Sequence, residues 1–437
     1  MPASASPEPV GPGAPPLLRS AIIIGGALLL ILVTYRWGRA LQAERYRTFV
    51  NAPPLTGNIE PRLSWASAIP VGVAGVALAL TPNWISKLRW RHLLIAGTAG
   101  ALLWSIGLAA TDGADGFLRS PTSSVDYLHT VSRVTDPLSF LRSFVDHLPA
   151  LQGHAFSHPP GMVLLLWSLD RAGLGGPWGE AAVGHVAAAL TVPVMLHLIR
   201  NVEGEGWARR ATPFLAFAPA AVFYGSGADP LFMLLGITGV ALMVKGLRDA
   251  PPAPKGLSMV ASGVVLGTAC FFSYGMILVV LAAIAVCLAQ RRFDAATRVA
   301  VGVAAVAAGF ALAGFWWLEG FLAARPLVLA SVVRSRPYSY FVVANIAAIL
   351  VVFGPAVWVA LTRLRWRRWL LPGFGLALMF VADISGLSKG EVERIWLPFV
   401  PLVMAGTGVF EGRSLRLWLG PQLAWASLVQ FVVRSPW

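Results

Sequence analysis

The chain has 437 residues, of which 57% are hydrophobic and only 12% are charged, and it carries a formal net charge of +14. Soluble globular proteins have roughly a quarter of charged residues, so this composition excludes a soluble protein and predicts a polytopic membrane protein. The positive charge does not indicate a nucleic-acid partner, because no basic cluster interleaves with aromatic residues in a polar domain.

The N-terminal segment is rich in proline, and we expect residues 1–19 to be disordered. The apolar run that follows is too long for a cleaved signal peptide and lacks a small-residue cleavage site, so we interpret it as a membrane anchor. With a second apolar run it makes residues 20–91 a pair of N-terminal transmembrane helices.

Apolar runs long enough to cross a bilayer recur along the whole chain. They lie near residues 20–38, 66–84, 92–110, 181–200, 211–226, 228–247, 257–272, 275–290, 298–317, 341–361, 370–383, 395–410 and 416–433. The pattern predicts an all-α transmembrane bundle of about 11–13 spans. The two cysteines, Cys270 and Cys287, lie inside such runs and are interpreted as packing residues.

The charges predict the orientation of the bundle. If the N-terminus is cytoplasmic, more than half of the 34 lysines and arginines fall in short inner connections, as the positive-inside rule requires. Most of the 20 carboxylates then fall outside. A group of arginines near the first two spans, which includes Arg36, Arg39 and Arg62, departs from this rule. We therefore expect the functional face to be the outer, acidic one.

The longest polar interruption, residues 111–180, separates two apolar runs on that outer face. Helical spacing of apolar residues within 127–148 predicts two short amphipathic helices on the membrane surface. The apolar run 159–173 has both ends on the outer side, so it is expected to be re-entrant or to lie on the surface.

Three residues of this loop are candidates for catalysis. Asp112 directly follows an apolar run, where partial desolvation suits a general base, although a helix cap or solvated acid is the alternative. Asp126 begins the first amphipathic helix, where an acid is also favoured by the helix dipole. His158 precedes two prolines that fix the backbone and aim the ring, although a lone histidine is more often structural.

Charged residues also gather just before a late span, at Lys389, Glu391, Glu393 and Arg394. Ionisable groups at membrane depth indicate function by default, and a guanidinium suits a lipid phosphate. The alternative is a snorkelling Arg394 paired with Glu391 or Glu393.

Two further outer segments are polar. Asp229 lies in a glycine-containing turn between two spans. Tyr338 belongs to a patch that is either functional or an interfacial belt and that includes Arg325, Arg334, Arg336 and Tyr340.

The order of these features resembles the GT-C superfamily of membrane glycosyltransferases, which includes protein O-mannosyltransferases and the aminoarabinose and arabinofuranosyl transferases. The resemblance covers residues 92–410, and its most specific parts are the His158-Pro159-Pro160 block and the block KGEVERIWLPF that begins at Lys389. It implies a catalytic module over 92–410 with an outer loop at 111–180, and it leaves 411–437 as a C-terminal transmembrane helix.

The resemblance also implies a hexosyl- or pentosyltransferase that uses a polyprenyl-phosphate sugar donor and an envelope glycan, lipid or protein acceptor. Its base is an aspartate of the first outer loop, which is Asp112 or Asp126 here. We favour Asp112, because its backbone is anchored by the end of a span. Asp126 and His158 would then orient the acceptor or a metal ion.

The remaining candidates are assigned to the substrates. Arg394 and Lys389 would hold the donor phosphate, and Asp229, Glu391, Glu393 and Tyr338 would contact substrate. No metal ligand is assigned, and a divalent metal ion is left open as a cofactor. The site would face the extracytoplasmic side of a multi-pass cell-membrane protein.

Two other functions compete with this interpretation. A transporter or flippase for a lipid-linked sugar requires charges within spans and pseudo-symmetric halves, whereas the acids here lie in outer loops and the halves do not match. An inactive scaffold of envelope assembly is compatible with the sequence.

Overall fold

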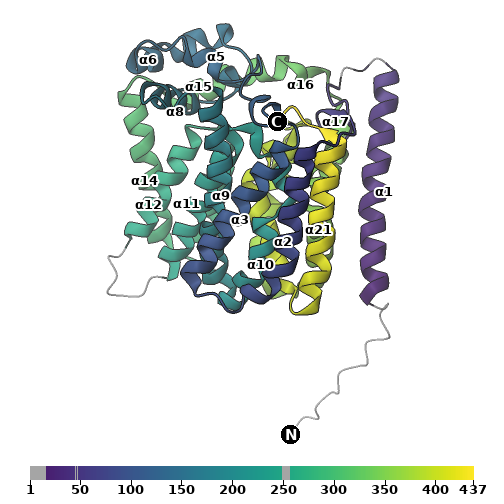
Figure 1. The fold of residues 1–437 in the computed structure, drawn as a ribbon. Coiled ribbons are helices and arrows are strands. Elements are labelled where there is room, and N and C mark those ends of the chain that lie inside the picture. The colour runs from purple at the N-terminus through teal and green to yellow at the C-terminus, as the bar shows by residue number, and fades with distance from the viewer. Residues whose placement is uncertain (1–15, 45, 47, 249–255) are drawn as a thin grey trace, which may run out of the picture.

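The described part of the chain, residues 16–44, 46, 48–248 and 256–437 of the computed structural model, is a bundle of helices with two very short strands (Figure 1). This confirms the all-α transmembrane class. Residues 1–15 of the tail predicted to be disordered, and Arg45 and Arg47, lie outside the described residues.

The chain runs through 21 α-helices within the described residues. They are α1 (Pro16–Ala43), α2 (Ala68–Trp84), α3 (Trp90–Ala110), α4 (Asp115–Leu118), α5 (Leu128–Val131), α6 (Pro137–His147), α7 (His154–Ser157), α8 (Gly161–Arg171), α9 (Gly176–Glu203), α10 (Glu205–Ala216), α11 (Ala228–Arg248), α12 (Leu257–Cys270), α13 (Ile277–Ala289), α14 (Phe293–Leu312), α15 (Trp317–Ala330), α16 (Val332–Ser335), α17 (Tyr338–Arg363), α18 (Leu370–Ile384), α19 (Val392–Ile395), α20 (Val400–Met404) and α21 (Arg413–Val432).

Short 3-10 helices join several of these elements: η1 (Trp65–Ser67), η2 (Leu148–Ala150), η3 (Pro219–Ser226), η4 (Tyr274–Met276), η5 (Trp366–Arg368), η6 (Leu397–Phe399) and η7 (Ala405–Val409). The strands β1 (Asn58–Ile59) and β2 (Val433–Arg434) pair antiparallel and fix the C-terminal segment to the connection between α1 and α2.

Seven helical segments in the described residues are long and apolar enough to cross a membrane. They are Leu17–Ala43, Trp90–Ala110, Gly176–Glu203, Ala228–Arg248, Phe293–Leu312, Tyr338–Arg363 and Val392–Val409. Four shorter apolar helices accompany them, at Trp65–Thr81, Leu257–Cys270, Tyr274–Ala289 and Leu370–Ile384. Most of the apolar runs predicted from sequence coincide with one of these helices.

Two predicted runs are divided between separate elements, and run 341–361 contains non-helical backbone at Gly354, with φ +73°. Run 211–226 is split where α10 ends at Ala216 and η3 begins at Pro219, and run 395–410 is divided among α19, η6, α20 and η7. Proline lacks an N–H and clashes with the preceding turn, which accounts for the interruptions at Pro219, Pro398 and Pro401. The second run is buried except at Ile395 and Val409, which are half-buried, so protein shields most of its irregular backbone from lipid.

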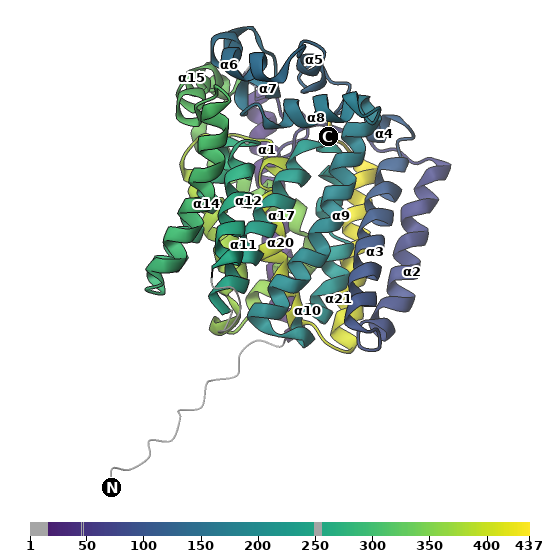
Figure 2. The same ribbon diagram turned by 90° about the vertical axis from the view of Figure 1, so that its left-hand side faces the viewer.

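The polar loop 111–180 folds over one end of the bundle. Helices α5, α6 and α8 lie together there with α15 in both views, α7 lies beside them in Figure 2, and the C-terminus lies at the same end (Figures 1 and 2). Of the two predicted amphipathic helices, α6 is a full surface helix, whereas α5 is a single turn. The run 159–173 becomes the short helix α8 at this end, as expected for a segment that does not span.

The basic connections meet at the opposite end, where α10 lies (Figures 1 and 2). Arg209 donates to the backbone carbonyls of Ile85 and Leu88, and Arg368 pairs with Glu203. These contacts join connections that are distant in sequence, so the acidic and basic ends are separated as the charge pattern predicted.

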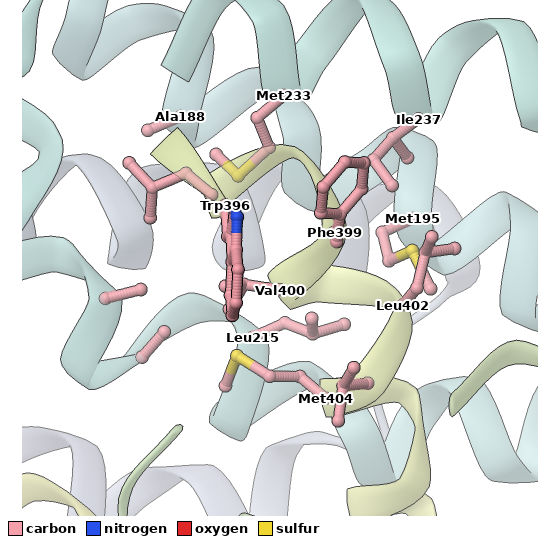
Figure 3. Packing of buried hydrophobic residues seen from close by; sticks show 14 of the residues in the cluster. Ala188, Met195, Leu215, Met233, Ile237, Trp396, Phe399, Val400, Leu402 and Met404 are labelled. Carbon is pink, nitrogen blue, oxygen red and sulfur yellow. The ribbon is translucent and has the colours of Figure 1, made fainter. Parts of the chain in front are cut away.

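The segment after α19 forms the core below the polar end. Figure 3 shows Trp396, Phe399 and Val400 packed among Met233 of α11 and Met195 of α9. Trp396 and Phe399 are almost fully buried. Because interiors are close-packed, this segment fixes the backbone of Arg394, which lies only two residues before Trp396.

Candidate functional site

Arg394 is the centre of a buried polar cluster at the acidic end of the bundle. Its Nη1 donates to Oδ2 of Asp229 at 2.9 Å, and its Nη2 donates to Oε2 of Glu391 at 2.7 Å. Nη2 also lies 3.1 Å from Nε2 of His154. The side chain is 6% exposed, so these charge-assisted bonds form away from water.

The backbone brings these partners together from three parts of the chain. Asp229 lies in the first turn of α11, directly after Gly227, whose φ of +64° makes the turn that starts this helix. Glu391 adopts a left-handed backbone, φ +61°, at the N-cap of α19. The glycine-containing turn and the late acidic loop, both selected from the sequence, therefore meet at Arg394.

A second arginine holds the late loop in place. Arg336 donates to Oε1 of Glu391 at 3.1 Å, to the carbonyl of Lys389 at 2.6 Å and to the carbonyl of Thr48 at 3.0 Å. Asn345 clamps the same loop by donating to the carbonyl of Ser388 at 2.6 Å. Burial alone would raise the pKa of Glu391, but Arg394 and Arg336 lower it to about 2. Glu391 is therefore ionised at neutral pH.

Asp126 lies in the turn before α5 and is 2% exposed. Its Oδ1 accepts the backbone N–H of Tyr127 at 2.5 Å, and its carboxyl group also meets that of Glu180 at the start of α9. Burial raises the pKa of Asp126, against the opposing effects of Glu180, two backbone N–H groups and the nearby Arg394. This places a carboxyl group with raised proton affinity beside the arginine cluster.

The turn that carries Asp126 is held against α7. His154 donates its backbone N–H to the carbonyl of Val125 at 2.8 Å. Gly153 allows this approach, because its φ is +53° and a Cβ there would lie 1.9 Å from the Val125 carbonyl oxygen. The local sequence thus positions Asp126 and His154 together.

Two histidines and Tyr127 pack together beside Asp126 and Arg394. The Tyr127 ring lies edge-on to His154 and His158, at centroid distances of 5.5 and 5.9 Å. Burial lowers the pKa of both histidines, so both are neutral at pH 7. Pro159 and Pro160 follow His158 and lead into α8, as the sequence predicted.

Asp112 lies in a neighbouring, separate cluster. Arg62 donates hydrogen bonds to both carboxylate oxygens of Asp112, with 2.9 Å between Nη2 and Oδ2. Arg119 also donates to Oδ2, at 3.2 Å. The ion pair explains why Arg62 lies on the outer face against the positive-inside pattern. A small cavity beside Asp112 has room for about one water.

Trp437 borders both clusters. Its indole lies against the guanidinium of Arg394, with 4.1 Å between Cζ and the ring centroid, and it also lines the cavity beside Asp112. Its Nε1 donates to Oε1 of Glu393 at 3.3 Å. The adjacent Ser435 carbonyl accepts a bond from Arg119 at 2.7 Å.

Three other predicted residues, Lys389, Tyr338 and Glu393, lie near the cluster. Among the described residues, none of the three makes a polar side-chain contact with Arg394. Lys389 donates Nζ to the carbonyl of Val333 at 3.3 Å, and Tyr338 donates its hydroxyl to the carbonyl of Ile384 at 3.1 Å. Glu393 is fully buried and accepts the backbone N–H of Thr56 at 2.9 Å. Their assignments to substrate stay predictions.

Among the described residues, no group of three histidine, cysteine, aspartate or glutamate side chains is arranged to hold a metal ion. The carboxylates of Asp229 and Glu391 are instead neutralised by arginine.

Sequence reasoning did not select Glu180, Tyr127 or Trp437. Glu180 is the last residue of the predicted outer loop 111–180, directly before the predicted run 181–200, and a carboxylate at that boundary was a usable signal for it. Tyr127 was assigned only to the apolar face of a surface helix. Nothing in the sequence distinguishes Trp437 from the chain's other tryptophans.

The comparisons with known proteins are sparse. No protein-family model matches the chain, and no curated protein matches it. Among solved structures, the chain is similar to ArnT from Cupriavidus metallidurans in the apo state, at 18% identity and a TM-score of 0.41. The match covers 70% of this chain and 59% of that chain, which is less than two thirds of the length of ArnT.

Proposed function

We propose that this protein is an integral-membrane glycosyltransferase that moves a sugar from a polyprenyl-phosphate donor to an acceptor of the cell envelope. One observation carries the proposal. Asp126 is a buried carboxyl group whose pKa is raised, and Arg394 is a fixed guanidinium. Both lie in the same cluster, at the end of the helical bundle that the polar loop 111–180 covers. These are the two groups that an inverting transfer from a sugar phosphate requires.

In the proposed step, Asp126 in its carboxylate form takes the proton of the acceptor hydroxyl. The hydroxyl oxygen forms a bond to the anomeric carbon from the face opposite the phosphate. The bond between that carbon and the phosphate oxygen breaks, and its electron pair stays on the phosphate. Arg394 stabilises the polyprenyl phosphate that leaves, and Lys389 lies on the adjacent loop.

Asp126 suits the role of base better than Asp112, which the sequence had favoured. Both oxygens of Asp112 are already held by Arg62 and one of them also by Arg119, so proton transfer to Asp112 would have to break an ion pair. Asp126 accepts only backbone N–H groups besides its contact with Glu180. We instead assign Asp112 the role of a positioning residue that holds the outer loop to the segment before α2.

Arg394 is bound to Asp229 and Glu391, so a donor phosphate would have to share or displace these carboxylates. This exchange keeps a buried cation neutralised in both states, which is cheaper than leaving it unpaired. His158 and Tyr127 contact each other in the same cluster, and we assign to them the orientation of the acceptor hydroxyl.

The proposed site faces the extracytoplasmic side. The basic connections that contact one another lie at the opposite end of the bundle, and the positive-inside rule assigns that end to the cytoplasm.

The experiment uses purified protein in lipid vesicles that contain a radiolabelled polyprenyl-phosphate sugar and an envelope extract as acceptor. We expect label to leave the lipid and free polyprenyl phosphate to accumulate. Transfer of intact donor to the opposite leaflet without cleavage would instead indicate a transporter. If folded protein neither cleaves the donor nor moves it to the opposite leaflet, the proposal that the protein is a glycosyltransferase is contradicted.

A further inference from the structure

Glu180 is a fully buried carboxyl group without an ordinary partner. It is the fifth residue of α9 and is 0% exposed. Neither of its oxygens receives a hydrogen bond from any donor in the described part of the chain. Buried carboxyl oxygens nearly always have such a donor, so this group requires an explanation.

The residues packed against Glu180 leave it facing Asp126. On one side is Gly227, where a Cβ would lie 2.8 Å from Oε1 and 2.9 Å from Cγ of Glu180. On another side is the carboxyl group of Asp126, which lies within hydrogen-bonding reach. Two ionised carboxylates in contact inside a protein repel each other strongly, whereas one proton between them turns the repulsion into a hydrogen bond.

The surroundings of the pair are asymmetric. Asp126 faces the positive charge of Arg394 and accepts the N–H of Tyr127. The charged group that acts on Glu180 is the carboxyl group of Asp126, and no guanidinium offsets it among the described residues. Of the other nearby groups, Asp229 is paired with Arg394, and the Tyr127 hydroxyl, close to both carboxyl groups, has no hydrogen-bond partner among the described residues. The negative charge of the pair is therefore best placed on Asp126, and the proton on Glu180.

We propose that Glu180 is a positioning residue that carries a proton at neutral pH and donates it in a hydrogen bond to the carboxylate of Asp126. This inference rests on the proposed function, in which Asp126 is the base. Glu180 orients the Asp126 carboxylate and removes the need for a second buried charge. When Asp126 takes the acceptor proton, the pair becomes neutral, and the proton returns to water after the product leaves.

The test compares Glu180→Gln, Glu180→Leu and a matched surface control, Glu319→Gln, whose side chain is exposed on α15. Glutamine keeps a donor toward Asp126 but has no proton to lose. We expect Glu180→Gln to retain transfer within about tenfold at pH 7. We also expect the wild-type rate to decline at high pH, where Glu180 loses its proton, and the Glu180→Gln rate not to decline there. Glu180→Leu removes the donor, and we expect a loss of ~10²-fold or more.

An identical pH profile in wild type and Glu180→Gln would overturn the proposal, because a group that only fills space would not change the alkaline limb. A dead Glu180→Gln protein that is folded would also overturn it, since the ionised carboxylate would then be required.

Infrared difference spectroscopy supplies a readout that does not depend on transfer. At pH 7 the wild-type spectrum minus the Glu180→Gln spectrum should contain a protonated-carboxyl C=O band, and the Glu319→Gln difference should not. If that band is present while neither wild type nor any variant cleaves a donor, the proposal that Glu180 carries a proton is supported and the proposed function is wrong. If the band is missing, the proposal that Glu180 carries a proton at pH 7 is wrong, whether or not the protein is active.

Discussion

The guanidinium of Arg394 lies beneath the indole of Trp437, with 4.1 Å between its central carbon and the ring centroid. Arg394 is thus enclosed by carboxylates at its edges and by an aromatic ring over its face. A desolvated contact of this kind contributes ~1–2 kcal/mol beyond its buried area. The C-terminal segment therefore helps to fix the cation on which the proposed chemistry depends.

The first prediction concerns this contact. Trp437→Phe keeps an aromatic face but loses the bond to Glu393, and Trp437→Ala loses both. We expect thermal unfolding midpoints in detergent to fall in the order wild type, Phe, Ala, and donor affinity to weaken in the same order. Trp366→Ala is the control, because Trp366 is 79% exposed beside Arg367. Equal midpoints for Trp437→Ala and Trp366→Ala would show that the contact is energetically neutral.

The second prediction is that lysine cannot replace Arg394. One ammonium group cannot reproduce the separate bonds to Asp229 and Glu391, and an unpaired buried carboxylate costs ~3–5 kcal/mol. We expect Arg394→Lys to unfold at a lower temperature and to raise the KM for the donor at least tenfold. Arg434→Lys, which changes two exposed ion pairs, should alter neither quantity measurably. Wild-type KM in Arg394→Lys would exclude bidentate recognition of the donor phosphate.

The third prediction is a pH dependence from His154. Burial and Arg394 lower its pKa well below the ordinary 6.5, so the folded protein holds it neutral while the unfolded chain protonates near pH 6.5. The unfolded state thus binds more protons, and stability should fall as the pH drops below about 6.5. Glu391, with its pKa lowered to about 2, contributes a separate loss only below its unfolded pKa of about 4.5.

His154→Gln should reduce the loss of stability between pH 6.5 and 5, because glutamine can still accept the Arg394 bond and does not titrate, while buried His158 still contributes to the slope. The measurement is the unfolding midpoint at each pH, with His147→Gln as an exposed control. A slope equal to wild type in His154→Gln would assign the pH dependence to other groups.

The fourth prediction is topological. Leu387→Cys in the late loop and Ser124→Cys in the long outer loop, both at exposed positions, should react with a membrane-impermeant maleimide added to intact cells. Arg291→Cys, exposed in the connection from α13 to α14, should react only after the membrane is opened. Native Cys270 and Cys287 are buried and should give little background. Labelling of the two loops from opposite sides would separate the residues that the site needs together.

Much of the architecture could be predicted from local patterns. The apolar runs predicted the membrane spans, and the basic connections predicted which end of the bundle is basic. Both predictions are local, because the bilayer constrains the length and the flanking charges of each segment separately. Residues close in sequence could be predicted in the same way. The pairing of Arg394 with Glu391 was one of the alternatives considered from the sequence, and the turn at His158-Pro159-Pro160 was predicted from its two prolines.

The partners of the site could not be predicted in the same way. Arg394 meets Asp229 across 165 residues, and Arg62 meets Asp112 across 50. Such pairs depend on which helices pack together, and periodicity does not encode this. The sequence favoured Asp112 because it is anchored at a helix end, but it contained no sign that two arginines would occupy that carboxylate.

The central claim is that Asp126, rather than Asp112, is the proton acceptor in sugar transfer. The most direct test is the initial rate of transfer from a polyprenyl-phosphate sugar by Asp126→Asn and Asp112→Asn in the same vesicles, at equal amounts of folded protein. We expect Asp126→Asn to lose ~10²–10⁴-fold in kcat, and Asp112→Asn to lose less than tenfold. Near-normal turnover by Asp126→Asn together with an inactive but folded Asp112→Asn would contradict the account and assign the base to Asp112.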